Sequence, residues 1–93
     1  MKIVFKDTFL NRLENQLLYI SIGSTERARK FKSLLFGRIK KIPLNPYLYR
    51  KSIYFEDESI RDLIFKGYTI VFRISPEYIE VFGFVKYQKE PTD

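Results

Sequence analysis

The stretch Ile60–Ile74, IRDLIFKGYTIVFRI, decides how this chain folds. Two runs rich in β-branched and aromatic residues, 60–65 and 68–74, flank the dipeptide Lys66-Gly67. Such runs indicate strands, and a two-residue connection in which glycine can adopt positive φ is typical of a tight hairpin. The pairing places Leu63 opposite Ile70 and Phe65 opposite Tyr68, which makes one face apolar. The other face is half polar, so we expect it to be open: it carries Asp62, Ile64, Thr69, Val71 and Arg73.

Further strand and turn signals lie on both sides of this hairpin. Ser75-Pro76-Glu77 predicts a turn, because proline is favoured at its second position, and Tyr78–Lys86 then forms the last strand. A loose tail follows from Lys89 to Asp93. Before the hairpin, a short strand at Ser52–Phe55 leads into the acidic turn Glu56-Asp57-Glu58. Lys2–Lys6, KIVFK, predicts a first strand.

Two helices are predicted between residues 7 and 43. In the first, Asp7 or Thr8 is the cap and Gly23 the stop in the left-handed conformation. Its apolar face is formed by residues spaced by three and four, namely Leu10, Leu13, Leu17 and Ile20. In the second, Ser24 or Thr25 is the cap and Pro43 ends the helix. Its apolar stripe consists of Ala28, Phe31, Leu35, Ile39 and Ile42.

The order of elements is therefore β-α-α-β-β-β, which is an α+β class. We expect a helical hairpin packed on one face of a mainly antiparallel sheet of about four strands, with residues 1–93 forming a single domain. The side chains predicted to be buried are Leu10, Leu13, Leu17, Phe31, Leu35, Ile70 and Phe72.

The positive charge is concentrated in one segment. From Arg27 to Lys51 there are nine cationic residues and no Asp or Glu, while the rest of the chain holds eight cations and all eleven acids. A patch of this kind attracts phosphate backbones or acidic proteins, and the alternative is a solvated helix face.

The composition excludes several kinds of site. Without Cys there is no disulfide, no Cys-based zinc site and no Cys nucleophile, and without His the commonest metal ligand and general base are missing. We therefore expect no metal ion and no cofactor. The chain shows neither a signal-peptide core nor a run of 18 apolar residues, so we expect a cytoplasmic protein that does not associate with a membrane.

The chain resembles the RelE/ParE family of bacterial toxins. The resemblance depends on the order of elements, on the NPYLYR segment after the second helix, and above all on IRDLIFKGYTIVFRI, where Arg61, Leu63 and Gly67 are followed by the matching residues Tyr68, Ile70, Phe72 and Arg73. It extends from about Phe5 to Gln88. It implies a toxin that is neutralised by a cognate, acidic antitoxin. It also implies one of two targets, since some members cleave mRNA at the ribosome and others poison DNA gyrase without nuclease activity.

The same resemblance allows the nuclease positions to be compared. The arginine that follows the Gly-Tyr pair in mRNA-cleaving members corresponds to Thr69 here, and two lysines of the best-known nuclease subgroup correspond to Ile60 and Asp62. Tyr87 lies near the position of a catalytic His or Tyr, with Lys86 and Lys89 beside it. RNA cleavage needs a base, an acid and a phosphate clamp. Glu77 or Glu80 could serve as base, and the remaining candidates for catalysis are Arg61, Arg73, Lys86 and Tyr87.

Three structural alternatives compete with these roles. Arg73 could form a surface ion pair with Asp62, Arg61 could pair with the acids at 56–58, and Tyr87 could be a packed aromatic. Tyr47 and Tyr49 could stack on bases or cover the edge of the sheet. We expect the target to be bound by Arg50, Lys51, Arg61, Arg73, Lys86 and Lys89, and the antitoxin by Lys30, Lys40 and Lys41.

Taken together, these residues predict a toxin that acts by binding an essential target, for example DNA gyrase. One alternative is a ribosome-dependent mRNA endonuclease. The second is a non-toxic nucleic-acid-binding or adaptor domain.

Overall fold

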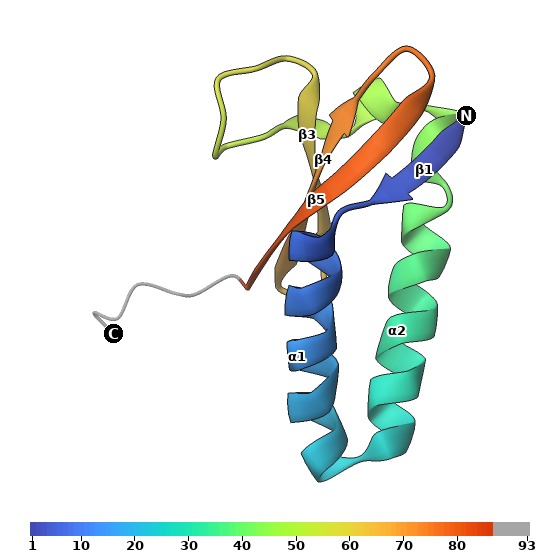
Figure 1. The fold of residues 1–93 in the computed structure, drawn as a ribbon, viewed down its shortest axis with the longest axis vertical. Coiled ribbons are helices and arrows are strands. Elements are labelled where there is room, and N and C mark those ends of the chain that lie inside the picture. Colours follow the sequence, from blue (N-terminus) through green and yellow to red (C-terminus); the bar gives the residue numbers. More distant parts are fainter. Residues whose placement is uncertain (87–93) are drawn as a thin grey trace.

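Two helices cover one face of a five-stranded sheet in the structure of this chain, a computed structural model that describes residues 1–86 (Figure 1). The elements are β1 (Lys2–Phe5), α1 (Asp7–Gly23), α2 (Thr25–Ile39), the 3-10 turns η1 (Ile42–Leu44) and η2 (Pro46–Leu48), β2 (Arg50–Lys51), β3 (Ile60–Phe65), β4 (Tyr68–Ile74) and β5 (Tyr78–Lys86). The predicted α+β class and order of helices and strands are confirmed.

The strands lie in the order β1-β5-β4-β3-β2, one strand more than the sequence suggested. β1 pairs in parallel with β5, and all other pairs are antiparallel. The additional strand is β2, whereas the strand predicted at Ser52–Phe55 was wrong. After Ser52 N–H donates to the Ile60 carbonyl (3.0 Å), the next two N–H groups bond side chains instead of the strand ladder. Pairing therefore stops at β2.

The β3–β4 hairpin has the predicted register, with Leu63 opposite Ile70 and Phe65 opposite Tyr68. Both turn residues adopt positive φ, 47° at Lys66 and 83° at Gly67. This conformation matches the twist of the flanking strands and keeps them paired up to the turn.

A β-bulge interrupts the pairing of β4 with β5. Val71 lies opposite Gly83, but the next residue, Phe72, lies opposite Val81. A Cβ atom at position 83 would lie 2.9 Å from the Val71 Cβ. Only glycine allows the two strands to approach so closely without a shift of the backbone.

The buried face of α1 differs from the predicted one. The cap is Lys6, without a side-chain hydrogen bond, rather than Asp7 or Thr8. The Lys6 N–H is bonded to the Val81 carbonyl (2.9 Å), so the helix begins directly after β1. This places Phe9 rather than Leu10 toward the sheet, and Leu10 is 39% exposed. Gly23 is the last residue of α1 and does not adopt positive φ; the chain leaves the helix through the extended residue Ser24.

The predicted start of α2 is confirmed, but the helix ends earlier than predicted, and Ile42 and Pro43 lie in η1. The Ser24 hydroxyl accepts a hydrogen bond from the Arg27 N–H (3.1 Å), and the helix ends at Ile39, ahead of Pro43. Ala28, Leu35 and Ile39 are buried, as is Ile42 just beyond the helix.

The core lies between the helices and the sheet. Of the seven predicted core residues, Leu13, Leu35, Ile70 and Phe72 are buried, Leu17 and Phe31 are half-buried, and Leu10 was wrong. Phe9 packs edge-on against Phe84, with ring centroids 5.9 Å apart. The full buried cluster is Phe9, Leu13, Leu35, Ile39, Ile42, Leu63, Phe65, Tyr68, Ile70, Phe72, Ile79, Val81 and Phe84.

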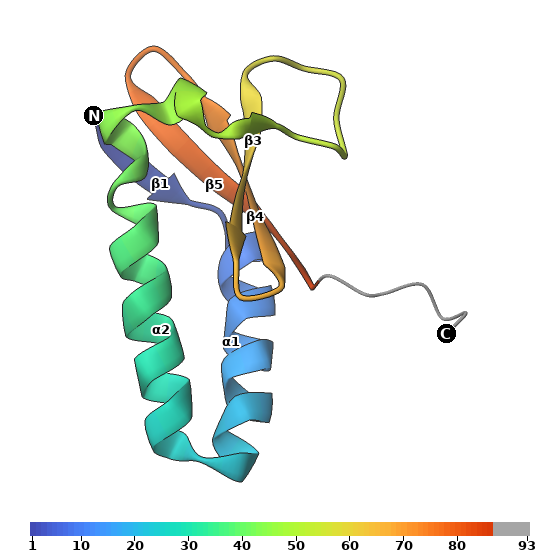
Figure 2. The ribbon, with the colours of Figure 1, turned by 180° about the vertical axis from the view of Figure 1, so that it is seen from behind.

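The helical hairpin extends beyond the sheet, and the α1–α2 connection lies far from the strands (Figures 1 and 2). Leu18, Tyr19 and Ile22 near this tip are exposed, Ile22 by 84%. No helix within residues 1–86 combines the length and the apolar character needed to cross a bilayer.

The opposite face of the sheet is less open than predicted. Asp62, Thr69 and Val71 are buried there, while Ile64 and Arg73 are exposed. The connection between β2 and β3 returns over this face: the Ile53 N–H donates to the Asp62 carboxylate, and the Phe55 and Phe82 rings are 5.6 Å apart.

Candidate partner-binding surface

Arg61, a predicted catalytic and target-binding residue, is buried within the structure. Its Nε donates to the Glu58 carbonyl (2.8 Å), and Nη1 donates to the Tyr49 carbonyl (3.0 Å). Its guanidinium lies 4.9 Å from the centre of the Tyr47 ring, and Tyr49 packs edge-on against Phe72. The alternative pairing with carboxylates at 56–58 is not formed, because Arg61 bonds backbone carbonyls. This side chain fastens the connection before β2 to the sheet.

Asp62 pairs with Arg50 and not with Arg73, so the ion pair expected across the hairpin was wrong. The register places Arg73 opposite Ile60, and its guanidinium lies 5.7 Å from the centre of the Phe82 ring. The buried Asp62 Oδ2 accepts hydrogen bonds from Arg50 Nε (3.2 Å) and the Ile53 N–H (3.2 Å), and Arg50 Nη2 lies 3.1 Å away in an ion pair. Asp62 Oδ1 has no hydrogen-bond partner among residues 1–86.

The other acids near this end also serve contacts within residues 1–86. Glu58 pairs with Lys51 (3.2 Å), and Glu80, half-buried on β5, pairs with Lys6 (3.7 Å). Glu77 is exposed in the turn before β5. Hydrogen bonds from Ser59 lower the pKa of Asp57, assisted by the charge of Arg73. None of these contacts joins Glu77 or Glu80 to a candidate acid or phosphate clamp, although the β4–β5 register places Glu80 opposite Arg73.

The C-terminal candidates are only partly described. Lys86 is the last residue of β5, is exposed, and places Nζ 6.0 Å from the Tyr19 ring centre. Tyr87 and Lys89 lie outside the described residues. Within residues 1–86 no group of three or more His, Cys, Asp or Glu side chains is arranged to hold a metal ion.

The cations of α2 form a different kind of surface. Seven cationic side chains on and just after α2 are exposed, and we call them together the α2 basic surface. They are Arg27, Arg29, Lys30, Lys32, Arg38, Lys40 and Lys41. Within residues 1–86, none of these seven forms an ion pair. Their charge is therefore available to a partner, and the three predicted antitoxin-binding lysines all belong to this surface.

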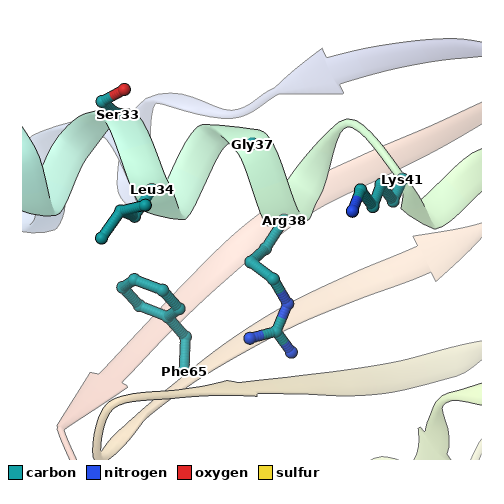
Figure 3. A pocket seen from close by; sticks show the side chains of 6 residues that line it. All are labelled: Ser33, Leu34, Gly37, Arg38, Lys41 and Phe65. Atoms are coloured by element: carbon teal, nitrogen blue, oxygen red, sulfur yellow. The ribbon is translucent and has the colours of Figure 1, made fainter.

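Two pockets lie along α2, and each is lined in part by the β3–β4 hairpin, by Phe65 in the first and by Lys66 and Tyr68 in the second. Figure 3 shows the first, in which Leu34 of α2 and Phe65 of β3 point toward each other, with Arg38 and Lys41 beside them. The second is lined by Ile20, Arg27, Lys30, Phe31, Lys66 and Tyr68. Burial, together with the nearby Tyr19, raises the pKa of the Tyr68 hydroxyl. We call these two pockets together the α2–turn groove.

The sequence prediction missed part of this groove. Lys66 was treated only as a turn residue, and Leu34 was not assigned a role. The hairpin turn brings Lys66 into the pocket lined by Arg27 and Lys30 of α2, with Nζ 5.7 Å from the Phe65 ring centre, and the Arg38 guanidinium lies 5.9 Å from the centre of the same ring. The exposed Leu34 in an otherwise basic helix face was the available signal.

The fold and its surface define a small basic α+β protein with an apolar groove rimmed by cations. The sequence matches the family described as "ParE toxin of type II toxin-antitoxin system, parDE" over residues 3–90. A solved structure described as the chromosomal ParDE TA system from P. aeruginosa is similar, with a TM-score of 0.76 and 14% identity over 95% of this chain and 97% of that chain. This likeness shows a shared fold. No curated protein matches the sequence.

This chain belongs to the ParE toxin family of type II toxin–antitoxin systems. The resemblance inferred from IRDLIFKGYTIVFRI is thereby confirmed. As a type II toxin, the protein has a cognate antitoxin as its partner.

Proposed function

We propose that this toxin inhibits growth by binding an essential bacterial protein, DNA gyrase, and not by cleaving RNA. Residues 1–93 act in this proposal as a single toxin domain in the bacterial cytoplasm. The supporting observation is the burial of Ile60, Asp62 and Thr69, the three positions that correspond to cations in the nuclease subgroup. Asp62 is neutralised by Arg50, and Arg61 bonds backbone carbonyls. A scissile phosphate would therefore find no clamp at these positions.

Losing such a clamp has a large effect on rate. Charge-stabilising groups contribute several kcal/mol to a phosphoryl transition state, so their absence removes orders of magnitude in rate. The exposed residues that could replace them are Arg73 and Lys86, with Tyr87 next in sequence. These residues are the first to examine if transcripts are cleaved.

We further propose that the antitoxin is acidic and binds the α2–turn groove. The groove combines apolar walls with cations that have no acidic partner within residues 1–86. An acidic amphipathic segment would bury apolar side chains there while pairing with Lys30, Lys41 and the neighbouring Lys40. Complementary charge of this kind speeds association and makes it sensitive to salt.

Inducible expression in bacteria tests the target. We expect growth arrest with DNA breaks and an SOS response, intact transcripts, and inhibition of supercoiling by purified gyrase. Cleaved transcripts without DNA damage would instead support the mRNA endonuclease, and Tyr87→Phe would then be the decisive variant. Normal growth with high expression of the chain would support the non-toxic adaptor.

A further inference from the structure

The connection from Ser52 to Ser59 exposes three consecutive large side chains. Ile53 is 67% exposed, Tyr54 46% and Phe55 45%. The connection projects from the sheet beside β3, at the end away from the tip of the helical hairpin (Figures 1 and 2). Contiguous apolar side chains on a projecting segment are typical of interaction sites, because exposing them to water is unfavourable. We call residues 53–58 the 53–58 knob.

Hydrogen bonds hold both arms of the 53–58 knob in place. At its start, the Ile53 N–H donates to the buried Asp62 carboxylate and the Tyr54 N–H to the Ser52 hydroxyl, each at 3.2 Å. At its end, the Asp57 side chain accepts from the Ser59 N–H (2.9 Å) and hydroxyl (2.7 Å). Phe55 also packs on Phe82. The knob is thus ordered before any partner binds, which lowers the entropy lost on binding.

The charge of the 53–58 knob is opposite to that of the α2 basic surface. Glu56, Asp57 and Glu58 follow the apolar residues directly; Glu58 is paired with Lys51, and Asp57 feels the charge of Arg73, so three acids face two cations here. Such a segment repels phosphates, and it also repels an acidic antitoxin. The chemistry that fits it is a protein surface with an apolar pocket rimmed by Lys or Arg side chains.

We propose that the 53–58 knob is the surface with which this toxin engages its target protein. Ile53, Tyr54 and Phe55 enter an apolar pocket, and Glu56 pairs with a cation at its rim. Aromatic side chains in such a pocket contribute much of the binding energy of a protein interface. This inference rests on the proposed function insofar as the target is a protein, and it holds whether or not that protein is gyrase.

The test compares two triple variants of the full chain in the absence of antitoxin. One carries Ile53→Ser, Tyr54→Ser and Phe55→Ser. The matched control carries Leu18→Ser, Tyr19→Ser and Ile22→Ser, which removes exposed apolar side chains at the tip of the helical hairpin. Thermal unfolding verifies that each is folded. We expect the knob variant to lose growth inhibition and to bind immobilised gyrase roughly tenfold or more weakly, and the control to match the wild type.

The outcomes separate this proposal from the choice of gyrase. If the wild type does not bind gyrase but the knob variant alone loses growth inhibition, gyrase is the wrong target and the knob remains the target surface. If the knob variant is folded, inhibits growth and binds like the wild type, the knob proposal is overturned.

A second pair of variants tests the charge without removing apolar contacts. Glu56→Gln with Glu58→Gln should weaken growth inhibition slightly, and Glu56→Lys with Glu58→Lys should weaken it more, because the rim of the target pocket is cationic. Stronger inhibition by the lysine variant would indicate a polyanionic target such as RNA and would also overturn the proposal.

Discussion

The cations near β2 and β3 bond other groups of the toxin itself, whereas the cations on α2 are available to a partner. Arg50, Lys51 and Arg61 each bond an acidic side chain or a carbonyl of the chain itself. The seven cations of the α2 basic surface form no ion pair within residues 1–86, and only Arg38 donates a side-chain hydrogen bond there, a long one to the Ile64 carbonyl (3.4 Å). Both sets lie in or near the same basic stretch of sequence. The comparison teaches that local charge alone does not identify a binding surface, because the cations already bonded internally contribute to stability instead.

The largest loss of stability is expected where a cation neutralises a buried acid. Arg50→Ala leaves the Asp62 carboxylate buried without a counter-charge, which should lower the free energy of unfolding by about 3 kcal/mol. Urea denaturation measures this value. Adding Asp62→Asn should recover part of the loss, and Lys40→Ala on the α2 basic surface serves as the neutral control. Equal losses for Arg50→Ala and Lys40→Ala would remove the distinction between the two sets.

The second-largest loss of stability is expected for Arg61, because its side chain donates hydrogen bonds to backbone carbonyls. Arg61→Met keeps the apolar stem but leaves the Glu58 and Tyr49 carbonyls without their donor, at a cost of about 2 kcal/mol. Arg73→Met provides the matched control, since the Arg73 side chain is exposed and its guanidinium lies over the Phe82 ring, without a hydrogen bond to a backbone carbonyl within residues 1–86. The urea midpoint of Arg73→Met should stay close to that of the wild type. The prediction is wrong if Arg73→Met is the more destabilised variant.

Substitutions on the α2 basic surface should change binding and leave stability nearly unchanged. Lys30→Glu, Lys40→Glu and Lys41→Glu together should leave the unfolding midpoint nearly unchanged and slow association with the antitoxin several-fold. Stopped-flow or surface-plasmon measurements at low and high salt test this expectation. An association rate that is the same in both salts, for wild type and variant alike, would make these lysines a solubilising face.

The smallest effect is expected for the exposed pair at the base of the 53–58 knob. Lys51 and Glu58 are both largely solvent-exposed, so Glu58→Gln should change stability by less than about 1 kcal/mol.

Asp57, the neighbour of Glu58, provides a test of the pH dependence of stability. Because its pKa is lowered in the folded state, its stabilising contribution is present above the unfolded pKa and is lost as pH falls through the folded pKa. Asp57→Asn should therefore flatten the acid side of the stability–pH curve.

Local patterns predicted most of the fold. The alternation around Lys66-Gly67 specified the strand register, since a slip by one residue would expose Leu63, Phe65 and Ile70 together. Ser24 was predictable as a cap from its position before the apolar stripe. The face of α1 was not, because Phe9 and Leu10 are both apolar and only the abrupt start of the helix after β1 decides between them.

The pairing of charges was beyond sequence reasoning for a different reason. Residues 45–59 have no periodicity, so nothing in the sequence shows that Arg50 would reach Asp62 or that Tyr47 and Tyr49 would meet Arg61. Lys66 likewise joins the α2–turn groove only through the packing of the hairpin against α2. These contacts are long-range in sequence, and each depends on the assembled fold.

The parallel pairing of β1 with β5 has a consequence for biosynthesis. β1, near residue 1, pairs with β5, which ends at residue 86, and β5 lies between β1 and β4. During translation the helical hairpin and the β3–β4 hairpin can form from local contacts, but β1 has no neighbour until residues 78–81 have emerged. Contacts between such distant segments form late and slowly. A nascent chain arrested before β5 therefore lacks a closed sheet, and cells would be exposed to the folded toxin only after nearly the whole chain has been synthesised.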